Sequence, residues 1–231
     1  FRLTRNNLKY PYSKPYINSR DIASVNSVLK KGYLTQGDKL IKFENRLKNT
    51  FKSKYSIACN SGTAALHMIY LALNVGNKNA ILTTPITFLA TANAAKMCNA
   101  TVHFADVDKH TGLMDLDEAE KKLKKFKNIS FISLVHLGGR LPDLESFYSL
   151  AQKYNCLIIE DACHAPGSAF KSKSGKHFLT GSCKYSIASS FSFHAIKHVA
   201  MGEGGCITTN DKLLFKKIKL LRNHGMIKNT A

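Results

Sequence analysis

The chain of 231 residues is 44% hydrophobic and 21% charged, a composition that excludes a mainly disordered protein and permits a sizeable core. No apolar run approaches the roughly 20 residues that span a bilayer, and the start of the chain lacks the apolar stretch of a signal peptide. We therefore expect a cytoplasmic protein without a membrane segment, although its net charge of +19 suggests an anionic partner.

Residues 1–18 are predicted to form an N-terminal arm, and residues 19–231 to form one domain. Two helices come first, at 19–31 and 38–51. From about residue 54, short apolar runs alternate with longer amphipathic stretches, which is typical of βα units around a mostly parallel sheet. Strands are expected at 55–59, 80–84, 101–105, 130–135, 156–160, 187–193 and 205–209. Helices are expected at 62–75, 86–97, 115–126, 143–154 and 211–223.

These elements predict an α/β fold, with three αβα layers built on a mostly parallel, seven-stranded sheet. Asp115 and Asp143 directly precede apolar-periodic stretches and are predicted helix N-caps. The six cysteines contain no C-x-x-C pair, so neither a disulfide framework nor a metal site is expected.

The basic residues are mostly lysines spread over predicted exposed helix faces, without zinc-finger spacing or an RNP-like aromatic strand. Specific nucleic-acid binding is therefore not expected. Solvated lysines are the favoured explanation of the charge, which would also attract a polyanionic substrate such as a nucleotide.

Ligands of open α/β sheets gather at the carboxyl ends of strands, so the loops that follow the predicted strands are the candidate binding sites. Residues 60–64 form a small, Gly-containing turn that opens a helix, where free backbone N–H groups and the helix dipole suit a phosphate. A tight turn with Ser61 as N-cap is the alternative. Asp161 follows Glu160 at the end of an apolar strand, where a carboxylate is costly without a positive partner. A cofactor role and an N-cap or surface ion pair remain open for Asp161, and His164 is either a ligand contact or a loop histidine.

Lys197 follows an apolar strand and precedes a Gly-rich turn at 202–205, which indicates a lysine held out of bulk water. Such an amine is a potential Schiff-base nucleophile, and a surface lysine is the alternative. Phe88, in a polar turn, could stack on a planar ring or belong to the core. A phosphate cradle, a buried acid, a lysine and an aromatic side chain together match the needs of pyridoxal 5′-phosphate.

Several motifs follow one another in a familiar order, at residues 32–37, 61–66, 87–93, 106–108, 135–139, 159–165 and 192–197. In this order they resemble the DegT-type (StrS-related) sugar aminotransferases, which are pyridoxal-phosphate enzymes of fold type I. The resemblance runs from about residue 14 to 231 and implies that this chain is the large domain. Family members continue into a small C-terminal domain that is absent here, so the chain looks truncated.

The resemblance implies two catalytic residues: Lys197, which binds the cofactor covalently, and Asp161, which pairs with the pyridine nitrogen. Phe88 has the position of the stacking aromatic, and His164 the position, often Gln in relatives, near the cofactor's 3′-oxygen. The phosphate-binding set implied in the same way is Gly62, Thr63, Ala64 and Ser192.

The implied activity is a ping-pong transamination from an amino-acid donor, usually L-glutamate. The acceptor would be a nucleotide-linked, UDP-type 4-keto-6-deoxy sugar of surface-glycan or pseudaminic acid-like nonulosonate synthesis. The family also implies a homodimer with shared active sites. The alternatives are a pyridoxamine-phosphate-dependent deoxysugar dehydratase, in which His replaces the lysine, and a non-catalytic regulator. Lys197 favours the aminotransferase, although His198 is adjacent. Residues 135–142 depart from the commoner form of that loop in the family, so the identity of the sugar substrate stays open.

Overall fold

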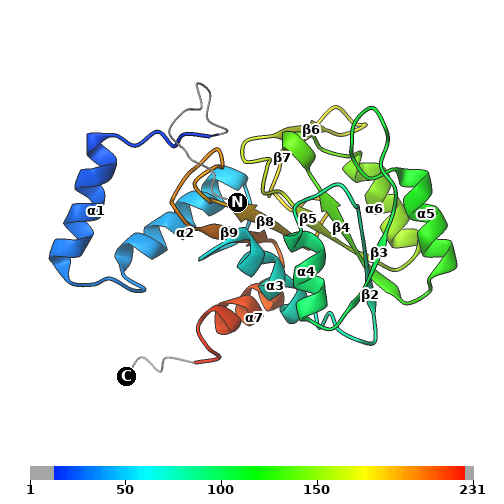
Figure 1. Cartoon of the computed structure of the whole chain (residues 1–231), viewed down its shortest axis with the longest axis horizontal. Coiled ribbons are helices and arrows are strands. Elements are labelled where there is room, and N and C mark those ends of the chain that lie inside the picture. Colours follow the sequence, from blue (N-terminus) through cyan, green and yellow to red (C-terminus); the bar gives the residue numbers. More distant parts are fainter. Residues whose placement is uncertain (1–12, 227–231) are drawn as a thin grey trace, which may run out of the picture.

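A seven-stranded sheet runs through the molecule in the order β1-β9-β8-β5-β4-β2-β3 (Figure 1). The computed structural model describes residues 13–226. The strands are Tyr55–Cys59 (β1), Ala80–Thr83 (β2), Thr101–Phe104 (β3), Ile129–Val135 (β4), Leu157–Asp161 (β5), Ala188–Ser192 (β8) and Gly205–Thr209 (β9). Strand β9 runs antiparallel to its neighbours β1 and β8, and the other neighbouring pairs are parallel. The predicted α/β class with a mostly parallel seven-stranded sheet is confirmed.

Helices cover both faces of the sheet. Helices α3 (Gly62–Ala72), α4 (Ala90–Met97) and α7 (Lys212–Arg222) share one apolar cluster with side chains of the central strands, such as Ile159. Helices α5 (Leu116–Lys125) and α6 (Leu144–Lys153) cover the other face, where their apolar side chains share a cluster with Ile158 of β5. Helix α2 (Asp38–Phe51) packs on the same face through Phe51, whose ring stacks on that of Phe191. Successive strand residues point to opposite faces, so residues 158–161 of β5 are buried between the two helix layers, and the strand is apolar up to Glu160 and Asp161 at its end.

Two parts lie outside these layers. Helix α1 (Ser19–Lys31) has no buried residue and projects from the body (Figure 1). Strands β6 (Ala169–Lys171) and β7 (His177–Leu179) form a small hairpin that the sequence did not predict. Residues 13–18 of the predicted arm have no helix or strand, residues 1–12 lie outside the described part, and the proposed division into arm and domain stays a prediction.

Side chains fix the starts of several helices. The predicted N-caps are confirmed: Asp115 accepts a hydrogen bond from the Glu118 N–H at 2.9 Å, and Asp143 accepts one from the Ser146 N–H at 3.0 Å. Within residues 13–226, no helix has the length and apolar character needed to cross a membrane, and no cluster of three His, Cys, Asp or Glu residues is arranged to hold a metal. All six cysteines carry free thiols.

Two predicted boundaries are wrong in ways that affect the site. Helix α4 begins at Ala90 rather than at residue 86, because Thr84 accepts a hydrogen bond from the Ile86 N–H and turns the chain before the helix. Asp161 is the last residue of β5 rather than the first residue after it, because it pairs with both Val135 and Ser190 in the sheet.

Gly205 allows a close approach between β9 and the start of α3. A Cβ atom at this position would lie 2.5 Å from the carbonyl carbon and oxygen of Ser61. We therefore expect Gly205→Ala to destabilise the protein by about 1–3 kcal/mol through overpacking. Urea unfolding measures the loss of stability. Gly76→Ala is the control, because a Cβ at that position would lie 3.5 Å from its nearest neighbour, which is ordinary van der Waals contact. Equal midpoints for the two variants would contradict the expectation.

Candidate active site

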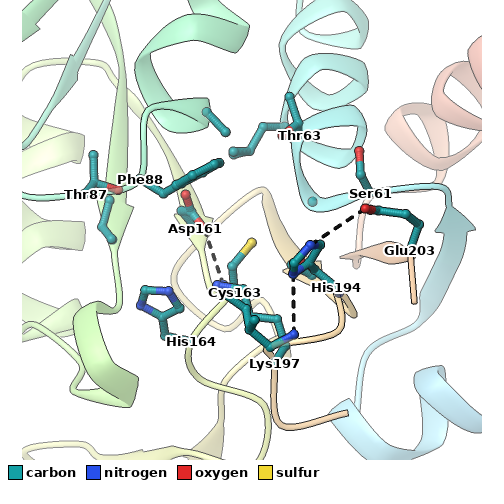
Figure 2. A pocket seen from close by; sticks show the side chains of 16 residues that line it. Ser61, Thr63, Thr87, Phe88, Asp161, Cys163, His164, His194, Lys197 and Glu203 are labelled. Atoms are coloured by element: carbon teal, nitrogen blue, oxygen red, sulfur yellow. Dashed lines mark hydrogen bonds and ion pairs between the residues drawn. The ribbon is translucent and has the colours of Figure 1, made fainter. Parts of the chain in front are cut away.

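A cavity of about 310 Å³ opens at the carboxyl ends of β1, β4, β5 and β8 (Figure 2). The carboxyl ends of these strands lie at the same edge of the sheet, which is where α/β folds bind their ligands. The cavity brings together residues from distant parts of the sequence. Seven of the eight predicted site residues line it: Gly62, Thr63, Phe88, Asp161, His164, Ser192 and Lys197. Ala64 does not line the cavity.

The N-terminus of helix α3 forms one wall of the cavity. Ser61 is its N-cap and accepts a hydrogen bond from the Ala64 N–H at 3.1 Å, so that N–H is already paired. Within the described residues, the N–H groups of Gly62 and Thr63 have no such partner, as expected at a helix start. A Cβ at Gly62 would lie 2.9 Å from Cβ of Ser192 and 3.0 Å from Sγ of Cys163, so only glycine lets the start of α3 approach the end of β8 this closely. The wall therefore offers N–H groups and a hydroxyl to a phosphate.

Asp161 lies in the floor of the cavity with 6% of its surface exposed. Its Oδ2 accepts a hydrogen bond from Thr91 Oγ1 at 2.6 Å, and its Oδ1 accepts one from the Cys163 N–H at 3.3 Å. No Lys, Arg or His of residues 13–226 forms an ion pair with this carboxylate. A protonated ring nitrogen in the cavity would supply the positive partner that a buried acid requires.

Glu160, the adjacent acid, points to the opposite face of the sheet. Its Oε2 lies 2.7 Å from Nε2 of His136, which is fully buried, and its Oε1 accepts hydrogen bonds from Ser186 and Ser189. Burial alone would raise the pKa of Glu160, but the hydrogen bond and charge of His136 outweigh it, so the pKa lies below its ordinary value. Glu160 is therefore structural, and of these two adjacent acids only Asp161 faces the cavity.

The lowered pKa of Glu160 has a consequence for acid stability. The contribution of Glu160 to stability is fully present above its ordinary pKa of 4.5 and is lost as the pH falls through the lower folded-state pKa. We expect Glu160→Gln to be less stable than the unchanged protein at pH 7 and to lose less stability below about pH 4.5. Urea unfolding over a pH series measures this. Glu118→Gln, on the surface of α5, is the control, and an unchanged pH profile for Glu160→Gln would contradict the expectation.

Lys197 lies in the connection between β8 and β9. Hydrogen bonds from the Phe193 N–H to Gly204 O at 2.7 Å and from the Met201 N–H to Phe193 O at 2.8 Å hold this connection together. The Lys197 side chain is half-buried and lines the cavity (Figure 2). Its Nζ has no hydrogen-bond or ion-pair partner in the part of the chain that the structure describes. The site therefore presents an uncommitted primary amine.

His164 and Phe88 complete the walls. His164 Nδ1 accepts a hydrogen bond from the Gly138 N–H at 3.4 Å, so the neutral ring carries its proton on Nε2. Burial and the nearby charge of Lys197 lower the pKa of His164 and outweigh the opposing charge of Asp161, so the neutral ring predominates at pH 7. Phe88 is 70% exposed beside the cavity, which excludes the core interpretation and leaves its ring free to stack.

Sequence reasoning missed several residues of the site. Glu203 and His194 lie at its rim, with Glu203 Oε1 3.7 Å from His194 Nε2. Cys163 lies beside Gly62. Burial, followed by the charge of Asp161, raises the pKa of the Cys163 thiol well above its usual range, so this thiol is neutral. Thr91, the buried partner of Asp161, was also missed, and its spacing of four residues from Thr87 was the available signal.

A model of the DegT/DnrJ/EryC1/StrS aminotransferase family matches residues 15–231. The UDP-4-amino-4,6-dideoxy-N-acetyl-beta-L-altrosamine transaminase of Campylobacter jejuni (strain 81-176) is 41% identical over 218 residues, which are 94% of this chain and 56% of the relative. The chain thus spans little more than half the length of this relative.

Two solved structures extend the comparison. Helicobacter pylori PseC, an aminotransferase of pseudaminic acid biosynthesis, is 34% identical with a TM-score of 0.87, covering 95% of this chain and 57% of that one. Streptococcus pneumoniae Spr1654 in its PLP form is 26% identical with a TM-score of 0.85, covering 96% of this chain and 60% of that one.

Proposed function

The chain belongs to the DegT/DnrJ/EryC1/StrS aminotransferase family, as its motifs suggested, and from this premise we propose that it binds pyridoxal 5′-phosphate and transfers an amino group to a nucleotide-linked keto-sugar. The observation that carries the proposal is the convergence of Lys197, Asp161 and the N-terminus of α3 on one cavity. The amine, the carboxylate and the anion cradle are the three groups that this cofactor requires from a protein. Spr1654, which has the same fold, has been solved in its PLP form.

The residues of the cavity fit the cofactor chemically. The N–H groups of Gly62 and Thr63 and the Ser192 hydroxyl would bind the phosphate, and glycine at position 62 lets the start of α3 and Ser192 lie close enough to share it. Phe88 would stack on the ring, and the His164 Nε2–H would donate to a ring oxygen. A contact from the Ala64 N–H stays a prediction, and it would compete with the Ser61 cap.

The chemistry depends on two residues. When bound, the cofactor supplies an electron-accepting ring and an aldehyde that carries the amino group from donor to acceptor. Lys197 Nζ would bind the aldehyde and, once released, would move the proton to and from the donor's Cα as general base and acid. Asp161 would hold the proton on the ring nitrogen, which keeps the ring positively charged while electrons move into it.

The acceptor class follows from the relatives. The C. jejuni relative is a transaminase for a UDP-linked 4-amino-4,6-dideoxy sugar, and H. pylori PseC acts in pseudaminic acid biosynthesis. We propose a UDP-linked 4-keto-6-deoxy amino sugar as acceptor and L-glutamate as donor, within surface-glycan synthesis in the cytoplasm. The excess of basic residues would favour the approach of such a dianionic nucleotide.

The test of this activity is an assay of the full-length gene product with a UDP-linked 4-keto-6-deoxy amino sugar and L-glutamate. We expect one 2-oxoglutarate to form for each amino sugar. Loss of a hydroxyl from the sugar without amino transfer would show a dehydratase instead. No reaction with any nucleotide-linked keto-sugar, in a protein loaded with cofactor, would contradict the proposed acceptor class.

A second copy of the protein is the proposed partner. Helix α1 exposes Ile22, Val25 and Leu29, which lie on one face by their spacing and are 56% to 60% exposed. The helix projects from the body, so this face is available to another chain (Figure 1). Light scattering during size exclusion is expected to give the mass of a dimer for the full-length gene product, and a monomer at all concentrations would contradict this.

A further inference from the structure

The carboxylate of Asp161 is held from behind by a buried hydroxyl. Thr91 is fully buried in the first turn of α4, and its Oγ1 lies 2.6 Å from Oδ2 of Asp161, a length typical of a strong hydrogen bond to an ionised group. Thr91 is not among the residues that line the cavity, so it acts on Asp161 and not on a ligand.

Two further oxygen atoms near Thr91 Oγ1 determine which way its hydroxyl donates. Thr91 Oγ1 also lies 3.0 Å from Thr87 Oγ1 and 3.3 Å from Phe88 O. A hydroxyl has one proton, and the ionised acceptor at 2.6 Å outcompetes the neutral carbonyl at 3.3 Å. Thr91 therefore donates to Asp161 and accepts from the Thr87 hydroxyl, which forms a chain in which each hydrogen bond strengthens the next.

The backbone of Thr91 is fixed from the opposite side. Tyr70, fully buried in α3, donates from its hydroxyl to Thr91 O at 3.2 Å and lies 3.0 Å from Ser133 Oγ in β4. Leu89, the N-cap of α4, makes no side-chain capping bond, so these contacts hold the first turn of the helix. Thr91 is thus anchored to α3 and β4 while its side chain reaches β5.

We propose that Thr91 is a positioning residue, which fixes the Asp161 carboxylate in the orientation needed to meet a cofactor's ring nitrogen. The other donors to this carboxylate in the described part of the chain both belong to Cys163: its N–H, at the longer distance of 3.3 Å, and its thiol, which is a weak donor. Without Thr91, the carboxylate can rotate about its Cβ–Cγ bond, and its oxygen no longer has a fixed place. This inference rests on the proposed cofactor.

The test compares Thr91→Val with Thr91→Ser in the full-length gene product. Valine has nearly the shape of threonine but lacks the hydroxyl, whereas serine keeps it. For Thr91→Val we expect a fall of about ten- to a hundred-fold in kcat with little change in KM, the range for a hydrogen bond to a charged group. Thr91→Ser is expected to keep most of the kcat of the unchanged protein.

The readout beyond activity is the induced circular dichroism of the bound cofactor, per molecule bound. It should weaken in Thr91→Val and recover in Thr91→Ser, because it reports how uniformly the ring is held. Thr209→Val is the matched control, since Thr209 is a buried threonine whose Oγ1 donates to Ile187 O at 2.7 Å, at the other end of the sheet. That variant should lose stability but keep the circular dichroism signal.

The outcomes separate the two proposals. Equal circular dichroism signals and kcat values for Thr91→Val and Thr209→Val, in a protein that binds cofactor normally, would overturn the role of Thr91 alone. Failure of the unchanged protein to take up cofactor at Lys197 would instead overturn the proposed function. If Thr91→Val does not fold, Thr91→Ala is compared with Thr91→Ser: a tenfold lower kcat and a weaker circular dichroism signal in Thr91→Ala support the inference, and equal values for the two variants contradict it.

Discussion

Replacing Lys197 by alanine is expected to abolish the visible absorbance band of lysine-bound cofactor and to lower amino transfer by at least about 10²–10⁴-fold, the usual contribution of a positioned acid–base group. Lys197 contributes the unpaired amine of the cavity, and no other lysine of residues 13–226 lines it. The phosphate cradle and Asp161 remain, so the variant should still bind pyridoxal phosphate, but without a covalent bond. Absorbance spectra and initial rates measure the two effects.

His198→Ala is the matched control for Lys197→Ala. His198 is adjacent in sequence, is exposed and is not among the residues that line the cavity. Its replacement should leave the band in place and the rate within a few-fold of that of the unchanged protein. If His198→Ala removed the band and Lys197→Ala kept it, the assignment of the lysine would be wrong.

Asp161→Asn is the second large expected effect. Asparagine keeps an oxygen that can accept the Thr91 hydrogen bond, so the fold should survive, but it removes the negative charge opposite the ring nitrogen. We expect kcat to fall on the order of 10²–10³-fold, the size of effect seen when one preorganised electrostatic contact is lost. Binding of the cofactor should weaken much less, because the phosphate cradle and Lys197 are unchanged.

The control for Asp161→Asn is Asp117→Asn, which removes an equal charge from the exposed surface of α5. The two variants change the net charge of the protein by the same amount. Equal rates for both would show that the charge of Asp161 has no special place in the reaction, and the proposed role of this residue would then be wrong.

The sequence predicted the sheet and the position of the site because both follow from alternation. Short apolar runs separated by amphipathic stretches require parallel strands covered by helices, and the loops after such strands meet at one edge. Lys197, Asp161 and Gly62 stand in three of these loops or at their ends, so their convergence could be expected without knowing the order of the strands.

The separate roles of the two adjacent acids could not be predicted. Which of Glu160 and Asp161 faces the cavity depends on the strand register, and the strand ends one residue later than its apolar run suggests. The partner of Glu160 is His136, 24 residues earlier, and no local pattern links the two. Thr91 was missed for a similar reason. A helix predicted to begin at residue 86 does not place Thr91 in a first turn, so nothing indicated that its side chain points toward Asp161.

Borohydride reduction of the full-length gene product with pyridoxal phosphate, followed by peptide mapping, tests the central claim most directly. The account predicts a visible absorbance band that is bleached on reduction and a stable cofactor label on the peptide that contains Lys197. A label on another lysine, or no label in a protein that is folded and supplied with cofactor, would contradict it.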